Sequence, residues 1–461
     1  MPRFAARGSA TLPAFGEAPG RALARTLTFR DLTLIVVGSV IGSGIFLVPG
    51  IVLRQVGGDV GWAMLVWIVA GVLSLLGALT YGELGALEPE AGGLYVFVRN
   101  AFGRFAGFLL GWTMFFVIAS GSVATLAVAF AAYSGTFITL GPTASRGVAL
   151  MTILVIAAIN VRGTRQSAVV QNWSTAIKAG MIVVLSAALL VIGRGLLPAL
   201  GGALDAPLSV SLLSGVGVAM IGVLWAYEGW QYVTFSVGEA VKPQRDFPRA
   251  IAAGTVILIA LYLLANVGYL AALGADRAAA SERIASEAAG ALFGTGAARV
   301  VAAAILVSMF SAANAVVLTA SRIFFAMARD GLFFRKLAEI HPRFGTPAFA
   351  VVAMSVWSAV LAATGTFEQL LTYVVFIGWI FYALGAAAVF VFRRRRPDAP
   401  RAFRVPGYPW TPALFVLSAA AIVLNTIATQ PGRALIGIGI VLLGAPAYAI
   451  WNRSAPSAAA P

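Results

Sequence analysis

The feature that most constrains the fold of this chain is its series of long apolar stretches that contain almost no charge. Each stretch is about as long as the roughly 20 apolar residues that a helix needs to cross a bilayer, although residues 143–161 are short for a span. Lipid offers no partner for backbone polar groups, so helices are the expected form. The sequence therefore predicts an all-α membrane protein with twelve transmembrane helices, at about 32–53, 61–82, 105–134, 143–161, 166–193, 212–238, 250–273, 300–321, 346–364, 368–392, 409–429 and 434–451.

Composition excludes a water-soluble protein. Of 461 residues 60% are hydrophobic and only 11% are charged, whereas a soluble domain has about 25% charged residues. The net charge of +15 is explained by position: with a cytoplasmic N-terminus, 24 of the 32 basic residues face the cytoplasm, 7 face the other side, and Lys178 lies inside a helix. This asymmetry follows the positive-inside rule. It predicts that both termini are cytoplasmic, that the protein spans the plasma or bacterial inner membrane many times, and that nucleic acid is not a partner.

The chain organisation is predicted to be simple. A cytoplasmic tail (1–30) precedes a single transmembrane domain (31–452), and a second cytoplasmic tail (453–461) follows it. The sequence contains no cysteine, which excludes disulfides and cysteine-based metal sites, and its one histidine, His341, lies in a charged loop. We therefore expect no metal, no cofactor and no enzymatic activity.

The first predicted span is interrupted at its centre by Gly42-Ser43-Gly44. Consecutive glycines inside a membrane helix free backbone groups that must find partners, and secondary transporters split helices in this way to hold a substrate at the midplane. An alternative is that Gly38 and Gly42 form a small-xxx-small pair that only allows close helix packing.

The sixth span has a second interruption, at Tyr227-Glu228-Gly229. A carboxylate inside a membrane helix costs about 2.5 to 3.5 kcal/mol on insertion scales, so Glu228 is a candidate functional residue. The alternative is a structural carboxylate bonded to neighbouring backbone. Helices one to five (about 31–193) and six to ten (about 212–392) would form two halves, with helices eleven and twelve (about 409–451) added. Because five crossings are an odd number, the halves are inverted, and the breaks in helices one and six occupy corresponding positions.

Five segments also resemble a known family. Val37–Pro49 (VGSVIGSGIFLVP) resembles the first-helix motif of the amino acid/polyamine/organocation (APC) superfamily. Four further segments of the chain resemble the L-type amino acid transporter branch of that superfamily and its bacterial relatives, namely Leu224–Ile251, Pro89–Gly103, Ser321–Gly331 and Phe403–Pro409. The resemblance covers about residues 28 to 450, with the segments in the same order and at the same spacing.

The resemblance implies a substrate site between the two broken helices. Backbone amides from Ile41 to Ile45 would hold the substrate carboxylate, and carbonyls near Trp225 would hold its amine, with Trp225 as an aromatic lid. Similar members often have Phe at that position, so pocket volume and side-chain preference stay open. The predicted substrate-binding residues are Ile41, Gly42, Ser43, Gly44, Ile45, Trp225, Ala226, Tyr227 and Glu228.

Four further residues are predicted to serve coupling and gating. Lys178 aligns with the fifth-helix lysine of the branch, and a fixed ammonium where sodium-coupled relatives hold a cation implies sodium-independent transport. Asn314 in helix eight is expected to support the Lys178 region. Glu83 and Glu239, at cytoplasmic helix ends, are expected to form gate ion pairs with nearby Arg or Lys. For Lys178 the alternatives are an ion pair with a carboxylate and a proton-switched amine.

The function expected from these features is secondary active transport of an amino acid by alternating access, as sodium-independent exchange. One alternative is proton-coupled uptake of a cationic amino acid or polyamine, since Glu228 could pair with an ammonium or carry a proton. A remote alternative is a nutrient-sensing receptor or channel on the same scaffold. The expected partners are the amino acid and the lipid bilayer. Eukaryotic relatives pair with a glycoprotein through a disulfide, which a chain without cysteine cannot form, so we expect a monomer.

Overall fold

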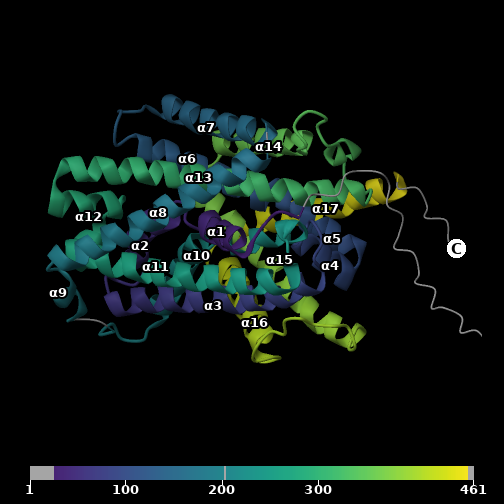
Figure 1. Cartoon of the computed structure of the whole chain (residues 1–461). Helices are drawn as coiled ribbons and strands as arrows, with labels where there is room; N and C mark the ends of the chain where they lie inside the picture. Colours follow the sequence, from purple (N-terminus) through teal and green to yellow (C-terminus); the bar gives the residue numbers. More distant parts are fainter. Residues whose placement is uncertain (1–24, 163, 202–203, 455–461) are drawn as a thin grey trace, which may run out of the picture.

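The computed structural model describes residues 25–162, 164–201 and 204–454, so most of the predicted tails lies outside the described residues. In this part most of the long helices lie side by side along one common direction, which is horizontal in Figure 1. The only β pairing among the described residues is an isolated bridge between Leu27 and Ala240. The all-α prediction is confirmed.

The helices occur in the following order: α1 (Phe29–Val40), α2 (Gly44–Gln55), α3 (Val60–Leu87), α4 (Leu94–Phe102), α5 (Arg104–Thr113), the π-helix η1 (Met114–Ile118), α6 (Ala119–Ser134), α7 (Pro142–Arg162), α8 (Thr164–Ile192), α9 (Leu196–Leu200), α10 (Val210–Ala226), the 3-10 helix η2 (Trp230–Glu239), α11 (Pro243–Ala280), α12 (Ile284–Phe293), α13 (Thr295–Arg329), the 3-10 helix η3 (Arg335–Ala338), α14 (Ala348–Thr364), α15 (Phe367–Arg395), α16 (Trp410–Thr429) and α17 (Pro431–Ser454).

The lengths and apolar composition of these helices are those of a multi-span membrane protein. Among the described residues ten helical segments are long and apolar enough to cross a membrane, and the bent pair α1 and α2 adds an eleventh when counted as one span. The apolar helix α14 has 17 residues. Each of the twelve predicted segments coincides with one of these helices or helix pairs.

Polar side chains fix where several helices begin. Thr28 and Asp31 form a capping box at the start of α1, in which each side chain bonds the other's backbone N–H. Asp59 caps α3 by accepting from the backbone N–H of Trp62 at 3.0 Å. The same carboxylate accepts from the N–H groups of Leu204 (2.9 Å) and Ala206 (3.1 Å), so it also ties down the segment before α10.

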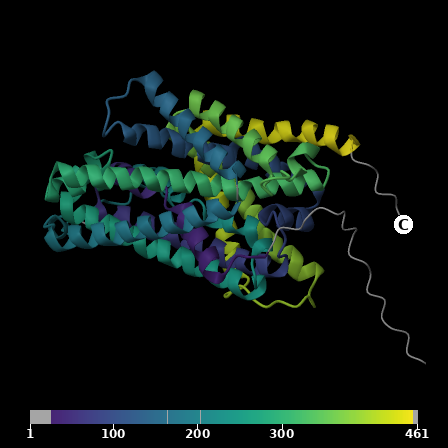
Figure 2. The same cartoon turned by 45° about the horizontal axis from the view of Figure 1, so that its top comes forward.

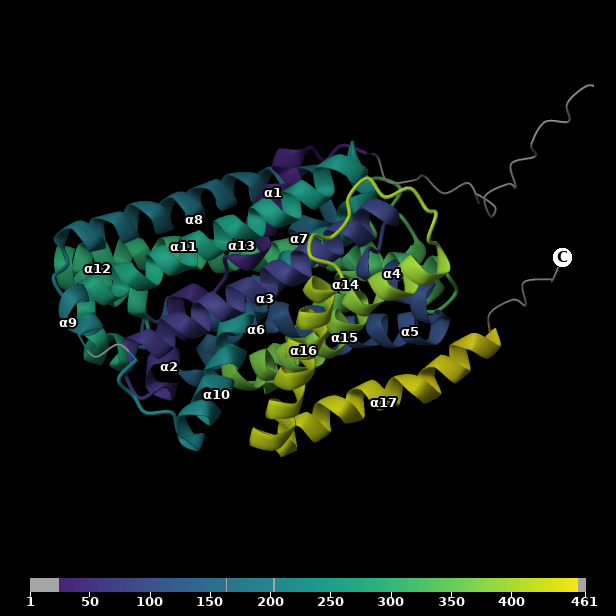
Figure 3. The same ribbon diagram turned by 90° about the horizontal axis from the view of Figure 1, so that it is seen from below.

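The first broken helix lies in the interior of the bundle. The α1 helix packs against α8, α11, α13 and η2, and its residues from Ile35 to Val40 are buried. By contrast, α17 lies along the outer edge of the bundle (Figures 2 and 3). Residues around the break in α1 are therefore shielded from lipid by other helices.

Both interruptions occur where the glycines lie. The α1 helix ends at Val40, α2 begins at Gly44, and the two axes are bent by 46°. The α10 helix ends at Ala226, and η2 begins at Trp230 after three turn residues. The last of these, Gly229, has φ +127°, a conformation that L side chains rarely adopt.

Candidate functional site

The two helix breaks touch each other. A Cβ atom placed on Gly44 would lie 2.4 Å from Cα of Ala226, and one on Gly229 would lie 2.8 Å from the carbonyl oxygen of Ser39. The Ser39 hydroxyl donates to the carbonyl of Gly229 at 3.0 Å. Glycine is thus needed at both breaks for backbone to meet backbone, which goes beyond the packing role considered for Gly38 and Gly42.

Tyr262 of α11 holds the two breaks from one side. Its hydroxyl lies 3.1 Å from the carbonyl oxygen of Val40 and 3.0 Å from that of Ala226, the last helical residues before each break. The side chain is fully buried. Tyr262 was not among the predicted site residues. Its position in the middle of an apolar span could have identified it, because a hydroxyl there needs a hydrogen-bond partner.

Lys178 of α8 binds the end of α1. Its Nζ donates to the carbonyls of Gly38 (2.6 Å) and Ile41 (2.7 Å) and lies 3.5 Å from the hydroxyl of Ser311 in α13. The hydroxyl of Ser308, also in α13, donates to Ile41 at 3.1 Å. Lys178 therefore connects the first, fifth and eighth predicted spans, and its partners in the described part of the chain are carbonyls and a hydroxyl.

Asn314 follows Ser311 by about one helical turn on α13. Its Oδ1 accepts a hydrogen bond of 2.8 Å from Asn160 of α7. This contact joins α13 to α7, the fourth predicted span.

A small cavity of about 20 Å³ lies between the breaks. Of the nine predicted binding residues, five line it, namely Gly42, Ser43, Gly44, Trp225 and Glu228. Its remaining lining residues, which the sequence analysis did not select, are Ser39, Val40, Ser122, Leu126, Tyr232 and Val316. The predicted residues Ile41, Ile45, Ala226 and Tyr227 are buried beside the breaks and are not among the lining residues.

Trp225 and Tyr227 point in different directions. The indole N–H of Trp225 donates to the Ser43 hydroxyl at 3.3 Å, so this ring reaches across the cavity from one break to the other. Its outer edge meets the ring of Phe367 at the start of α15, with 6.5 Å between centroids. The Tyr227 hydroxyl instead donates to the carbonyl of Trp67 in α3 at 3.4 Å.

Glu228 is buried and lines the cavity. Its Oε1 accepts from the Tyr382 hydroxyl of α15 and from the Gln231 amide, both at 2.5 Å. Nearby, the hydroxyls of Ser122 and Tyr232 lie 3.2 Å apart. This side of the cavity is therefore polar.

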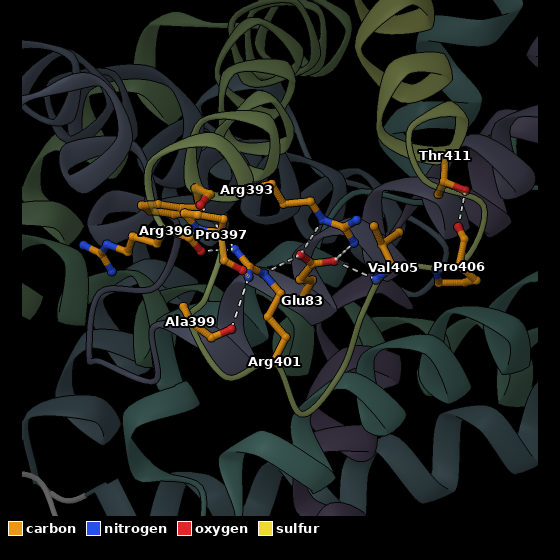
Figure 4. Close-up of polar contacts among 10 residues, drawn as sticks. Glu83, Arg393, Arg396, Pro397, Ala399, Arg401, Val405, Pro406 and Thr411 are labelled. Carbon is orange, nitrogen blue, oxygen red and sulfur yellow. Dashed lines mark hydrogen bonds and ion pairs between the residues drawn. The ribbon is translucent and has the colours of Figure 1, made fainter.

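Glu83 and Glu239, the carboxylates predicted to act as gates, each form a buried ion pair. Glu83 at the end of α3 accepts from Nε (2.9 Å) and Nη2 (2.7 Å) of Arg393 in α15, and from the backbone N–H of Val405 at 2.7 Å. Nε of Arg401 lies 3.3 Å away (Figure 4). Glu239 accepts from Nε of Arg322 in α13 at 2.9 Å. The sequence predicted basic partners without identifying which ones.

Comparisons with known proteins match almost the whole chain. The family described as "Amino acid permease" matches residues 27–443. The chain is similar to the serine/threonine exchanger SteT of Bacillus subtilis (31% identity, covering 90% of this chain and 94% of the exchanger). It is also similar to the rat large neutral amino acids transporter small subunit 2 (31%, covering 96% and 84%) and to the human cystine/glutamate transporter (30%, covering 96% and 90%).

Proposed function

Because the chain belongs to the amino acid permease family of the APC superfamily, we propose that it exchanges amino acids across the membrane by alternating access, without sodium. The protein is a multi-pass membrane protein, and its relatives are named as transporters and exchangers rather than enzymes. The observation that carries the proposal is the contact between the two helix breaks around a small, partly polar cavity.

The proposed architecture has twelve spans, with both termini in the cytoplasm. Residues 31–193 and 212–392 form the two inverted halves, and helices at 409–451 complete the bundle. The positions of the breaks support this division, because α1/α2 and α10/η2 fall in the first and sixth predicted spans. The substrate would lie where the halves meet, as in other transporters built from inverted repeats.

The substrate carboxylate is proposed to bind at the start of α2. The first amides of a helix have no intrahelical acceptor, and they lie at the positive end of the helix dipole. Gly42, Ser43 and Gly44 place this end of α2 at the wall of the cavity. A zwitterionic amino acid can therefore dock its carboxylate there without a charged side chain.

The substrate amine is proposed to bind carbonyls at the end of α10. Two of these carbonyls already accept a bond: that of Trp225 from the Glu228 N–H, and that of Ala226 from Tyr262, both at 3.0 Å. A carbonyl oxygen has two lone pairs, so each can still accept a second donor. In this arrangement Trp225 would close over the bound substrate, with its N–H on Ser43.

Glu83 and Glu239 are proposed to stabilise the closed cytoplasmic gate. Each ion pair joins elements distant in the sequence, with α3 bound to α15 and η2 bound to α13. Opening this side would require these buried pairs to separate. Because the transporter is proposed to act as a monomer, no second subunit is needed for this gate.

Sodium independence is proposed from the position of the Lys178 ammonium, which occupies the carbonyls of Gly38 and Ile41. The test is uptake of a labelled amino acid into proteoliposomes preloaded with unlabelled amino acid. We expect equal uptake with sodium or choline outside, and none in liposomes that contain no amino acid. Uptake that follows an imposed sodium gradient would contradict the proposal.

A second candidate function is proton-coupled uptake of a cationic amino acid or polyamine. The presence of the Glu228 carboxyl at the cavity wall favours it. The same proteoliposomes decide between the two functions. Accumulation into empty liposomes under an inward proton gradient would indicate symport, whereas a strict need for internal amino acid indicates exchange.

A further inference from the structure

We propose that Glu228 selects the substrate side chain, favouring short side chains that end in a hydrogen-bond donor over apolar and acidic ones. This inference rests on the proposed function, because it assigns a role within the same cavity. The shared chemistry of the favoured substrates is a hydroxyl or an ammonium group. The backbone contacts proposed for the carboxylate and the amine of the substrate do not distinguish one substrate side chain from another.

The two carboxylate oxygens of Glu228 are used unequally. Both protein donors, Tyr382 and Gln231, bind Oε1 of Glu228. Among the described residues no donor binds Oε2, while the side chain lines the cavity. Because Oε2 is not among the fully buried polar atoms that lack a partner, it is open to the cavity, where a donor on the substrate can bind it.

The Glu228 carboxylate is also held in place. Gln231 bonds three groups at once: its amide nitrogen donates to Glu228 and to the Tyr382 hydroxyl (2.7 Å), and its oxygen accepts from the Gly229 N–H (3.2 Å). Because Tyr382 comes from α15, the carboxylate is fixed from two different helices. A fixed acceptor discriminates between substrates better than one that can turn away.

The cavity wall combines bulky apolar side chains with hydroxyls. Trp225 and Leu126 supply large apolar side chains around the cavity, while Ser122 and Tyr232 add hydroxyls. Bulky walls limit the length of the substrate side chain. The polar side rejects a methyl group in place of a hydroxyl, because its own polar groups would then lack partners.

Threonine and valine provide the sharpest comparison, because they have nearly the same shape and differ in a hydroxyl against a methyl group. In the exchange assay we expect the wild-type protein to prefer threonine to valine by about tenfold or more. Glutamate should compete poorly, because its carboxylate would face that of Glu228. Equal exchange of threonine and valine by the wild type would overturn the inference while leaving the proposed function intact, whereas no exchange of any amino acid would remove the function on which it rests.

Two variants test the assignment to Glu228. Glu228→Leu should abolish the preference for threonine over valine. Glu228→Gln keeps an acceptor oxygen without the charge, so it should retain threonine exchange but lose exchange of the cationic amino acid ornithine if the wild type carries it. This comparison separates hydroxyl from ammonium recognition.

The matched control is Glu339→Leu, which makes the same change at an exposed position between η3 and α14 and should keep the wild-type threonine/valine ratio. A purely structural role predicts that Glu228→Leu lowers thermal stability but leaves the ratio unchanged in the protein that remains active. That result would overturn the inference. If Glu228→Leu does not fold, the wild-type threonine/valine ratio still decides, because equal exchange of the two amino acids overturns the inference.

Discussion

Replacing Glu83 by Gln should destabilise the folded protein by about 3 kcal/mol. Glu83 is 2% exposed and is bonded through two nitrogens of Arg393. Breaking a buried ion pair costs about 3 to 5 kcal/mol, since it leaves an uncompensated buried charge. The lower end applies because Arg401 has other hydrogen-bond acceptors that remain after Glu83 is replaced. It also donates to the backbone carbonyls of Phe392, Arg396, Pro397 and Ala399 (Figure 4).

Glu90→Gln is the matched control. Glu90 lies 3.8 Å from Arg99, and its side chain is 60% exposed, so this pair is solvated and should contribute less than about 1 kcal/mol. Both variants are compared with the wild type by denaturant-induced unfolding in detergent, with the free energy of unfolding as the readout. A loss for Glu83→Gln no larger than that for Glu90→Gln would refute the reasoning.

Three further predictions follow from the contacts at the breaks and at the start of α3. Gly44→Ala should sharply reduce the yield of folded protein, because its Cβ would lie 2.4 Å from Cα of Ala226. Gly42→Ala, whose Cβ would lie 2.9 Å from a methyl group of Leu126, should fold but exchange more slowly in proteoliposomes. Tyr262→Phe should lower the free energy of unfolding by about 1 to 2 kcal/mol, through loss of its hydrogen bond to the buried carbonyls; no change in denaturant unfolding would count against this. Burial raises the pKa of the Asp59 carboxyl, but donation from backbone N–H groups outweighs it and holds the pKa below its usual value. The stabilisation that ionised Asp59 gives to the folded protein should therefore be present above about pH 4 and be lost as the pH falls through the lowered pKa. The variant Asp59→Asn should flatten the acid limb of a plot of unfolding midpoint against pH.

Features encoded within one segment could be predicted from the sequence. The apolar runs located the helices, and the glycines and the carboxylate inside those runs located both breaks. Pairings between segments could not be predicted in the same way, because they depend on helix rotation and packing. Thus Glu83 was expected to have a basic partner, but the choice of Arg393 and Arg401 appears only when α15 packs beside α3.

The polar side of the cavity was missed for a related reason. Tyr232 and Tyr382 are two of several hydroxyl-bearing residues in apolar spans, and the sequence does not say which of these residues face the interior. Their partners come from α6 and from the turn before η2, far away in the chain. A search for every hydroxyl inside a predicted span would have found them, together with many that only bond their own helix, such as Ser74.

The Tyr262 hydroxyl has one hydrogen and two carbonyl oxygens within reach, so it can serve only one of them at a time. If the two breaks move apart, the hydroxyl can stay with whichever one remains near α11 and release the other. The tyrosine keeps its full complement of donated bonds throughout such a step. In the proposed transport cycle the two breaks can thus separate without stranding this buried donor, and the barrier to their separation would come from other contacts, such as the ion pairs of Glu83 and Glu239.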